Sequence, residues 1–175
     1  PFKGLIMAIL ISPMIVPLII TAAGVFFFYA KWGLVGTYTG LILAHTALGT
    51  PFVVITVTAT LTGFDTNLVR ASQSLGANTM KTFFKVIMPL ILPGVISGAL
   101  FAFITSFDEV VVVLFLGSVD QITIPRQMWA GIRQEISPII LCMATCLVAL
   151  SIGLLTTVEL LRRRSERLRG IKLRN

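Results

Sequence analysis

Two adjacent acidic residues, Asp108 and Glu109, interrupt an apolar stretch of the sequence. A charge at the centre of a bilayer costs about 3 kcal/mol, so such an acid usually faces protein, water or a cation. A cationic amine on its way across a membrane could meet this pair; the alternative is an internal strut held by hydrogen bonds or an ion pair. Successive helix residues point about 100° apart, so only one of the two can face a pathway squarely unless the helix unwinds there.

Other residue types that could do chemistry give weaker signals. His45, the single histidine, lies among small residues of another apolar stretch, and we expect it to be buried and hydrogen-bonded rather than a proton relay. Cys142 and Cys146 lie one helical turn apart, and we expect them to act as small packing residues. The sequence shows no phosphate-binding loop, metal-ligand cluster or nucleophile with a histidine base. We therefore predict no catalytic residue, no metal and no cofactor, and ATP hydrolysis would have to come from separate subunits.

The elements that position these residues are long apolar segments. Hydrophobic residues make up 56% of the chain and charged residues 12%, and the mean hydropathy is +0.97. Each of four runs, 5–29, 34–61, 90–116 and 139–161, exceeds the ~20 residues that a helix needs to cross a bilayer. We predict an all-α integral membrane protein, with tilted or broken helices in the first two runs. Residues 62–88 are too polar to cross, and residues 162–175 form a basic tail.

The basic residues predict the orientation of these runs. There are 14 basic and 7 acidic residues, and the basic ones cluster at the ends of the apolar runs, which favours lipid headgroups over nucleic acid as the partner. Lysine and arginine near helix ends are retained on the cytoplasmic side. Lys31, Arg126 and Arg133 fall on one side, and the remaining basic residues fall on the other. We therefore expect both termini and residues 62–88 to be cytoplasmic.

Residues 62–88 predict two short helices joined by a glycine turn. Asp65 can cap the first helix, and a mildly apolar face recurs at helical spacing. Gly76 can end that helix in a left-handed conformation, and Asn78 or Thr79 can cap the second helix. Such a pair could be an inert connection, or it could dock into a groove on a soluble partner. The predicted face consists of Leu68, Ala71, Ser72, Leu75 and Thr79.

Two stretches of this segment carry a family resemblance. Residues 70–77 read RASQSLGA, and residues 86–94 read VIMPLILPG. Together they resemble the EAA loop of permease subunits in binding-protein-dependent ATP-binding-cassette importers, in which a coupling helix sits in a cleft of the ATPase. Two positions depart from the motif, because Arg70 replaces its glutamate and Ser72 its second alanine. The resemblance implies that the ATPase-coupling residues are Leu68, Ala71, Ser72, Leu75, Gly76, Ala77 and Pro89.

A second region narrows the resemblance. The stretches SFDEVVV (106–112), FLGS (115–118) and TIP (123–125) are similar to spermidine/putrescine-type importer permeases. This similarity implies the type I importer permease fold, a polyamine substrate, and Asp108 and Glu109 on its pathway. It also implies four kinds of partner: a second permease subunit, two ATP-binding subunits, a periplasmic substrate-binding protein and membrane lipid.

Several alternatives remain open from the sequence. Related importers carry opines, other amines or metal ions, and an ion-coupled secondary transporter or a membrane scaffold would also be apolar and helical. We detect neither extra intramembrane acids nor an inverted repeat, which a secondary transporter would be expected to show. Family members have six spans in each subunit, so the resemblance implies that the first two are missing here. The chain begins at Pro1, and we expect no signal peptide.

Overall fold

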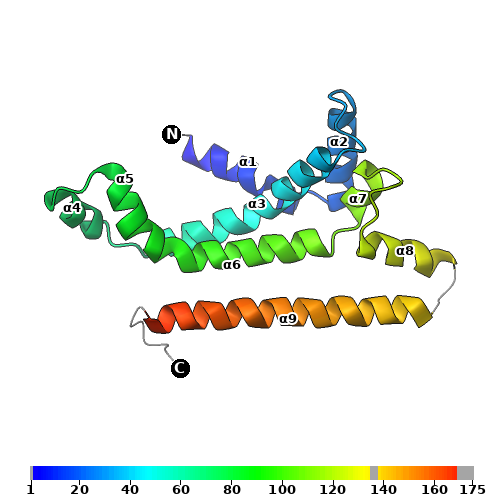
Figure 1. Cartoon of the computed structure of the whole chain (residues 1–175). Helices are drawn as coiled ribbons and strands as arrows, with labels where there is room; N and C mark the ends of the chain where they lie inside the picture. Colours follow the sequence, from blue (N-terminus) through cyan, green and yellow to red (C-terminus); the bar gives the residue numbers. More distant parts are fainter. Residues whose placement is uncertain (1, 135–137, 169–175) are drawn as a thin grey trace.

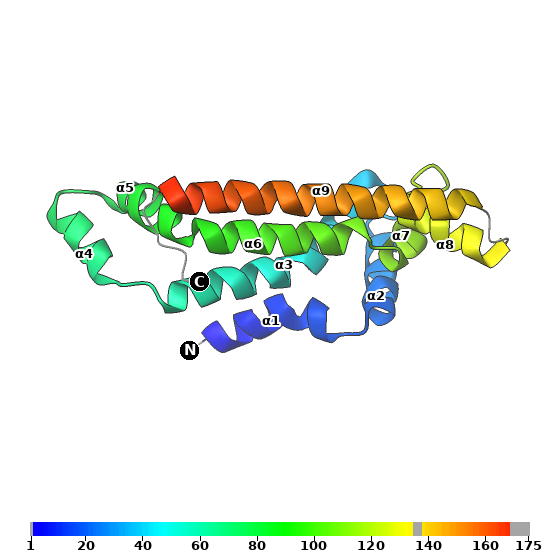
Figure 2. The same ribbon diagram turned by 90° about the horizontal axis from the view of Figure 1, so that it is seen from below.

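The computed structural model describes residues 2–134 and 138–168, and every regular element among them is a helix. Helices α3, α6 and α9 form the long axis of the molecule, with α4 and α5 at one end and α2, α7 and α8 at the other (Figures 1 and 2). The elements are α1 (Lys3–Ile15), α2 (Leu18–Ala30), α3 (Tyr38–Thr62), α4 (Asn67–Ser74), α5 (Thr79–Thr82), a π-helical turn (Phe83–Ile87), α6 (Met88–Phe107), α7 (Val111–Leu116), α8 (Ile124–Gln134) and α9 (Pro138–Leu168).

Three helical segments of the described chain are long and apolar enough to cross a membrane, namely Tyr38–Thr62, Thr79–Phe107 and Pro138–Thr157. The first predicted run forms a fourth crossing only if α1 and α2 count together, because they are bent by 109°. The bend follows from Pro17, which lacks a backbone N–H and favours an extended conformation at Val16, where ψ is 134°. The broken helix expected for this run is therefore present. Pro13 and Pro51, by contrast, lie inside continuous helices.

The third and fourth runs also differ in detail from the pattern in the sequence. The run 90–116 is interrupted, since α6 ends at Phe107 and α7 begins only at Val111. Helix α9 continues past the predicted boundary at Leu161 to Leu168, because arginine, although too polar for the bilayer, is a good helix former. Residues 169–175 of the predicted basic tail lie outside the described residues.

Small residues let α3 and α6 pack closely, as membrane helices do where glycine replaces larger side chains. A Cβ at Gly98 of α6 would lie 2.7 Å from Val53 Cα of α3, and one at Gly94 would lie 3.0 Å from Thr56 O. On α3, a Cβ at Gly49 would lie 2.9 Å from the Cβ of Ala102. The contact therefore depends on glycine from both helices.

A small core joins the remaining elements at the α7 end. Ala22 of α2, Ala44 and Leu48 of α3, and Val112 and Leu116 of α7 form one buried cluster. The carbonyl oxygen of Leu116 also accepts a hydrogen bond of 2.8 Å from Gly36 N. The short helix α7 is therefore fixed against α2 and α3.

Candidate functional site

The turn between α4 and α5 has the predicted glycine geometry. Gly76 has φ +80°, in the left-handed region. Its N–H donates to Gln73 O at 2.9 Å, and Ala77 N–H donates to Ser72 O at 3.1 Å. This double closure is a Schellman motif, which satisfies the last carbonyls of α4. The predicted left-handed glycine is confirmed.

Both predicted capping residues accept backbone hydrogen bonds, but only one of them is the N-cap residue of its helix. Asn78 Oδ1 accepts a hydrogen bond of 2.8 Å from Lys81 N, which confirms Asn78 as the cap of α5. Asp65 Oδ1 accepts one of 2.9 Å from Asn67 N, although the N-cap of α4 is Thr66. Asp65, one residue before the N-cap Thr66, therefore accepts a hydrogen bond from an N–H group that has no partner within α4.

The predicted coupling residues divide between two sides of α4. Leu68, Ala71 and Leu75 are exposed, and 88% of Leu75 is accessible. Ser72 turns inward instead, and its hydroxyl lies 2.9 Å from that of Thr82, a residue only 2% exposed. Ser72 therefore joins α4 to α5 rather than forming part of the exposed face. Ala77 is half-buried in the turn, and Pro89 is the second residue of α6.

The two predicted pathway acids, Asp108 and Glu109, lie where the helix unwinds between α6 and α7. Glu109 is only 5% exposed, and its carboxylate accepts hydrogen bonds from Val112 N at 2.7 Å and Val113 N at 3.2 Å. It therefore caps the N-terminus of α7, where a negative charge is favoured. Asp108 is exposed and borders a separate groove of about 270 Å³ against α9. The unwinding sends the two carboxylates into different environments.

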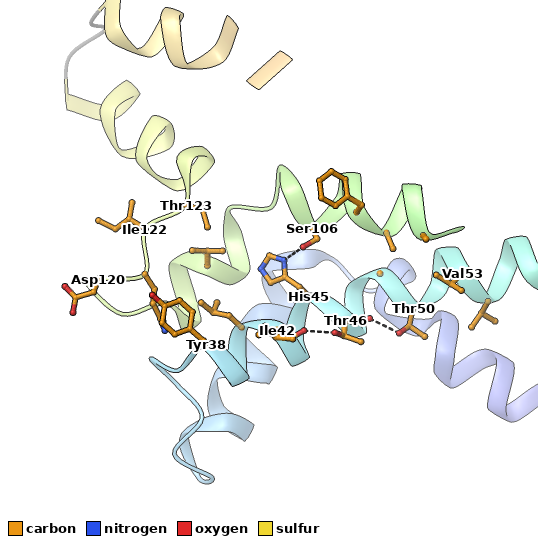
Figure 3. Close-up of a pocket in the computed structure, with 18 residues that line it drawn as sticks. Tyr38, Ile42, His45, Thr46, Thr50, Val53, Ser106, Asp120, Ile122 and Thr123 are labelled. Carbon is orange, nitrogen blue, oxygen red and sulfur yellow. Dashed lines mark hydrogen bonds between the residues drawn. The ribbon is translucent and has the colours of Figure 1, made fainter. Parts of the chain in front are cut away.

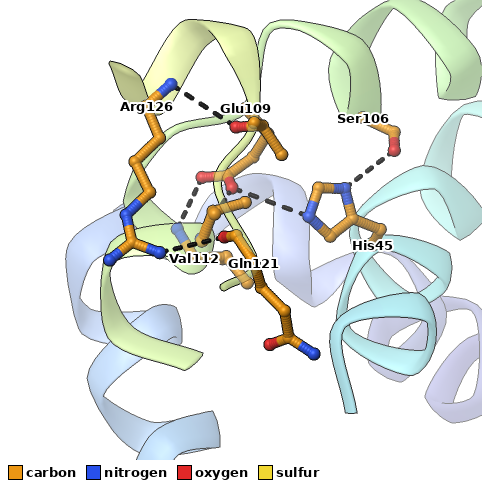
Figure 4. A network of polar contacts seen from close by, with 8 residues as sticks. His45, Ser106, Glu109, Val112, Gln121 and Arg126 are labelled. Carbon is orange, nitrogen blue, oxygen red and sulfur yellow. Dashed lines mark hydrogen bonds and ion pairs between the residues drawn. The ribbon is translucent and has the colours of Figure 1, made fainter. Parts of the chain in front are cut away.

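His45 links this cap to α3 and α6 (Figure 4). Its Nδ1 lies 2.7 Å from Ser106 Oγ, and its Nε2 lies 3.8 Å from Glu109 Oε2. The half-buried, hydrogen-bonded histidine agrees with the sequence expectation. The acidic partner was not foreseen, because Glu109 is distant in sequence and comes close only through the break after α6.

A cavity of about 890 Å³ lies along α3 and α6 (Figure 3). Small-molecule sites in proteins commonly occupy 300–1,000 Å³. Its wall is mostly apolar, with polar groups from Tyr38, His45, Thr46, Thr50, Ser106, Asp120, Gln121 and Thr123. Neither Asp108 nor Glu109 is among the residues that line it. The cavity reaches from the loop after α7 to the middle of α3.

The loop that closes one end of this cavity, residues 117–123, is held by Arg126. The Arg126 Nη1 donates to Ser118 O and to Gln121 O, both at 3.0 Å. Figure 4 shows the bond to Gln121. Gln121 Oε1 in turn accepts from Ser118 N at 3.0 Å. Asp120 and Gln121 were not predicted from the sequence, because nothing in their spacing shows that this loop folds over α3. The only available signal was an acidic residue between two spans.

The two cysteines lie on the exposed side of α9. Cys142 and Cys146 are unpaired thiols, and both border an apolar groove next to Phe107. They are therefore surface residues of α9 within this chain.

The fold defines the class of this protein before any relative is considered. Three or four candidate membrane spans, a helix pair projecting from one end and a broken span at the other describe an all-α membrane protein. The structure is similar to the inward-facing MetNI methionine ABC transporter, with a TM-score of 0.73 and 22% identity, over 93% of this chain and 73% of that one. This likeness shows the type I importer permease fold that the sequence predicted.

Residues 1–167 match the family described as "binding-protein-dependent transport system inner membrane component", and the chain belongs to that family. It is therefore a multi-pass inner-membrane protein of the transport permease class.

Named relatives agree with the family. The spermidine/putrescine permease protein PotC of Haemophilus influenzae is 30% identical over 93% of this chain and 62% of its own length. The putrescine permease protein PotI of Escherichia coli K12 is 30% identical over 74% of this chain and 47% of its own. The osmoprotective compounds uptake permease GgtD of a Synechocystis strain is 32% identical over 77% of this chain and 47% of its own. The chain thus spans less than two thirds of the length of these relatives.

Proposed function

We propose that this chain is the membrane-spanning permease subunit of an ATP-driven importer, in which it forms half of the translocation pathway. The observation that carries the proposal is the exposed helix pair α4–α5 at the end of α3 and α6, in a chain of the transport permease family. Leu75, 88% exposed, and Leu68, 44% exposed, are apolar side chains that a soluble partner can bury. That partner is a separate ATP-hydrolysing subunit.

The helix pair is connected to the far end of the molecule by continuous helix. Residues Thr79–Phe107 form one uninterrupted segment of 29 residues, about 44 Å long at 1.5 Å per residue. A movement imposed on α4 and α5 is therefore transmitted along α6 to the break at Asp108. Packed helices shift between discrete arrangements rather than deforming continuously, which is how such a movement can open the pathway to alternate sides.

The partners and the orientation follow from the same proposal. A second permease subunit completes the pathway, two ATP-binding subunits hold the α4–α5 pairs, and a periplasmic substrate-binding protein delivers the substrate. Both termini and α4–α5 face the cytoplasm, and the excess of basic residues on that side supports this orientation. Anionic lipid headgroups contact the same basic residues.

The proposed substrate is a polyamine. Its support is the similarity to relatives named for spermidine and putrescine. The relative named for osmoprotective compounds favours a second candidate, another small solute carried by the same mechanism.

Reconstitution tests the whole proposal. The chain is purified with its partner permease, ATPases and receptor, and the complex is placed in liposomes that contain ATP. We expect uptake of labelled spermidine only when ATP, the ATPases and the receptor are all present. Uptake driven by a proton or sodium gradient without ATP would indicate a secondary transporter. If neither polyamine nor any other solute is taken up in an ATP-dependent way, the importer proposal is refuted and a non-transporting membrane scaffold is the remaining alternative.

A further inference from the structure

The residue that stands out at the large cavity is Asp120. It is exposed and lies on the 117–123 loop at one end of the cavity, and its carboxylate points outward, away from Thr46 and Thr50 (Figure 3). No ion pair to Asp120 is found among the described residues, and Asp120 is the one formally charged residue among those that line the cavity. Its carboxylate is therefore available to a ligand from outside the chain.

The polar groups along the cavity wall suit a positively charged ligand. Thr46 donates its hydroxyl hydrogen to Ile42 O, and Thr50 donates its own to Thr46 O, each at 2.7 Å. A hydroxyl has one donor and two acceptor lone pairs, so each oxygen keeps its ability to accept. The wall therefore offers acceptors at intervals on an apolar background. Ammonium groups, which only donate, match the acceptors, and methylene chains match the apolar surface.

The loop is built to hold Asp120 in place without neutralising it. Arg126 directs its Nη1 to two carbonyl oxygens of the loop, Ser118 O and Gln121 O, and does not line the cavity. The buried side chain of Gln121, 7% exposed, closes the loop from the other side through Ser118 N. Asp120 therefore lies on a braced loop between α7 and α8, and these two helices lie at the end of α6 opposite α4 and α5 (Figure 1).

We propose that this cavity is a binding site for a linear aliphatic amine and that Asp120 holds the ammonium group at its mouth. This site depends on the proposed import function, and it identifies Asp120 as the residue that selects a cationic substrate. The hydroxyl oxygens of Thr46 and Thr50 then accept from the amine further along the wall. Asp120 acts at the side opposite the ATPase-docking helices, where substrate released by the receptor arrives.

The test compares Asp120→Asn with wild type in the complete reconstituted transporter, at saturating receptor. The amide keeps the size of the side chain and removes its charge. Because charge-assisted hydrogen bonds are roughly twice as strong as neutral ones, we expect spermidine uptake to fall about tenfold. Asp120→Glu restores the charge, and we expect it to keep most of the uptake.

Two controls separate substrate recognition from folding and coupling. Asp65→Asn removes a charge from an exposed aspartate at the α4 end, and we expect uptake to remain within about twofold of wild type, since its amide oxygen can still accept from Asn67 N. Equilibrium binding to the purified complex without receptor is measured with spermidine and with 1,8-octanediol, an uncharged chain; only spermidine binding should weaken in the variant.

The possible results show whether the Asp120 site alone fails or whether the proposed polyamine import fails as well. If wild type imports spermidine and Asp120→Asn imports it equally well, the site is refuted and the polyamine importer stands. If Asp120→Asn weakens octanediol and spermidine binding alike, the carboxylate does not recognise the charge and the site is again refuted. If wild type hydrolyses ATP but neither binds nor imports spermidine, both the polyamine assignment and the site are refuted.

Discussion

At the scale of single residues, neighbours in the sequence have separate roles once the backbone leaves the helix. Asp108 and Glu109 follow one another, yet Glu109 is buried against two backbone N–H groups of α7 while Asp108 is exposed beside α9. A helix would have held the two carboxylates about 100° apart on one element. Because α6 ends at Phe107, the directions of the two carboxylates are no longer set by helix geometry. The contacts of Glu109 fit the alternative in which this acid is an internal group held by hydrogen bonds. A role on the substrate pathway stays a prediction for both residues.

Glu109 should contribute more to stability than its neighbour. Glu109→Ala removes the acceptor for two N–H groups and the partner of His45, and leaving buried donors unpaired costs about 1–3 kcal/mol each. Asp108→Ala removes an exposed carboxylate, for which we expect a change within about 0.5 kcal/mol. Unfolding of the purified variants in detergent, followed by tryptophan fluorescence against denaturant, measures the difference. Equal loss in both variants would contradict the capping role.

Gly76 should be needed for its backbone conformation rather than for its size. A Cβ added there meets no atom within 4 Å, but φ is +80°, where other L-residues are strained by about 1–2 kcal/mol. Gly76→Val should therefore disturb the α4–α5 turn and reduce ATPase stimulation by loaded receptor, while the chain still inserts into the membrane. Gly76→Asn is the matched control, since asparagine tolerates this region, and we expect it to keep most of the stimulation. Unchanged stimulation in Gly76→Val would count against the docking role.

At the scale of elements, the contact between α3 and α6 sets the spacing of the two helices along which the cavity lies. That contact uses glycine on both sides, with Gly94 and Gly98 on α6 and Gly49 on α3. Without side chains at these positions, van der Waals contact extends to the backbones themselves, which is a main source of attraction between helices in lipid. The cavity residues Thr46 and Thr50 are therefore held at a fixed distance from α6.

Two glycine-to-alanine changes should have opposite effects. Alanine at Gly98 would place its Cβ 2.7 Å from Val53 Cα, and overpacking of this kind costs about 1–3 kcal/mol. Alanine at Gly24 of α2 meets nothing within 4 Å and improves helix propensity by up to about 1 kcal/mol. Denaturant unfolding of the two variants measures both free energies. A Gly98→Ala protein as stable as Gly24→Ala would show that α3 and α6 do not pack as described.

At the scale of the whole molecule, the two ends of the long helices carry different surfaces. The α4–α5 pair lies at one end, and α7 and α8 lie at the other (Figures 1 and 2). The first end exposes Leu68 and Leu75, and the second carries Asp120 on the 117–123 loop. In the proposed importer, these ends face the ATPases and the receptor. Their separation along α6 means that the two partners communicate through helix movement and not through contact.

A pair of single cysteines tests this orientation. After Cys142 and Cys146 are replaced by alanine, Gly63→Cys and Val119→Cys place one thiol near each end. Gly63 is exposed with open space for a Cβ, and Val119 is 83% exposed, so neither change should disturb packing. In intact cells an impermeant maleimide should label Val119→Cys, whereas Gly63→Cys should react only after permeabilisation. The reverse pattern would place α4–α5 in the periplasm, away from any ATPase.

The sequence by itself determined the features that depend on neighbouring residues or on composition. Long apolar runs require helices in a bilayer, where backbone groups must be paired within the segment. The left-handed Gly76 and the Asn78 cap were predicted because their hydrogen bonds close within three to five residues. The family resemblance added the type I permease fold, which the comparisons show.

Only the tertiary structure decided the features that join distant parts of the chain. His45 meets Ser106 across 61 residues, and the 117–123 loop lies at a cavity whose other wall begins at Tyr38. The inward turn of Ser72 toward Thr82 likewise depends on how α4 and α5 pack. Local spacing carries no information on such contacts, since their energy comes from surfaces that meet only after the helices have formed.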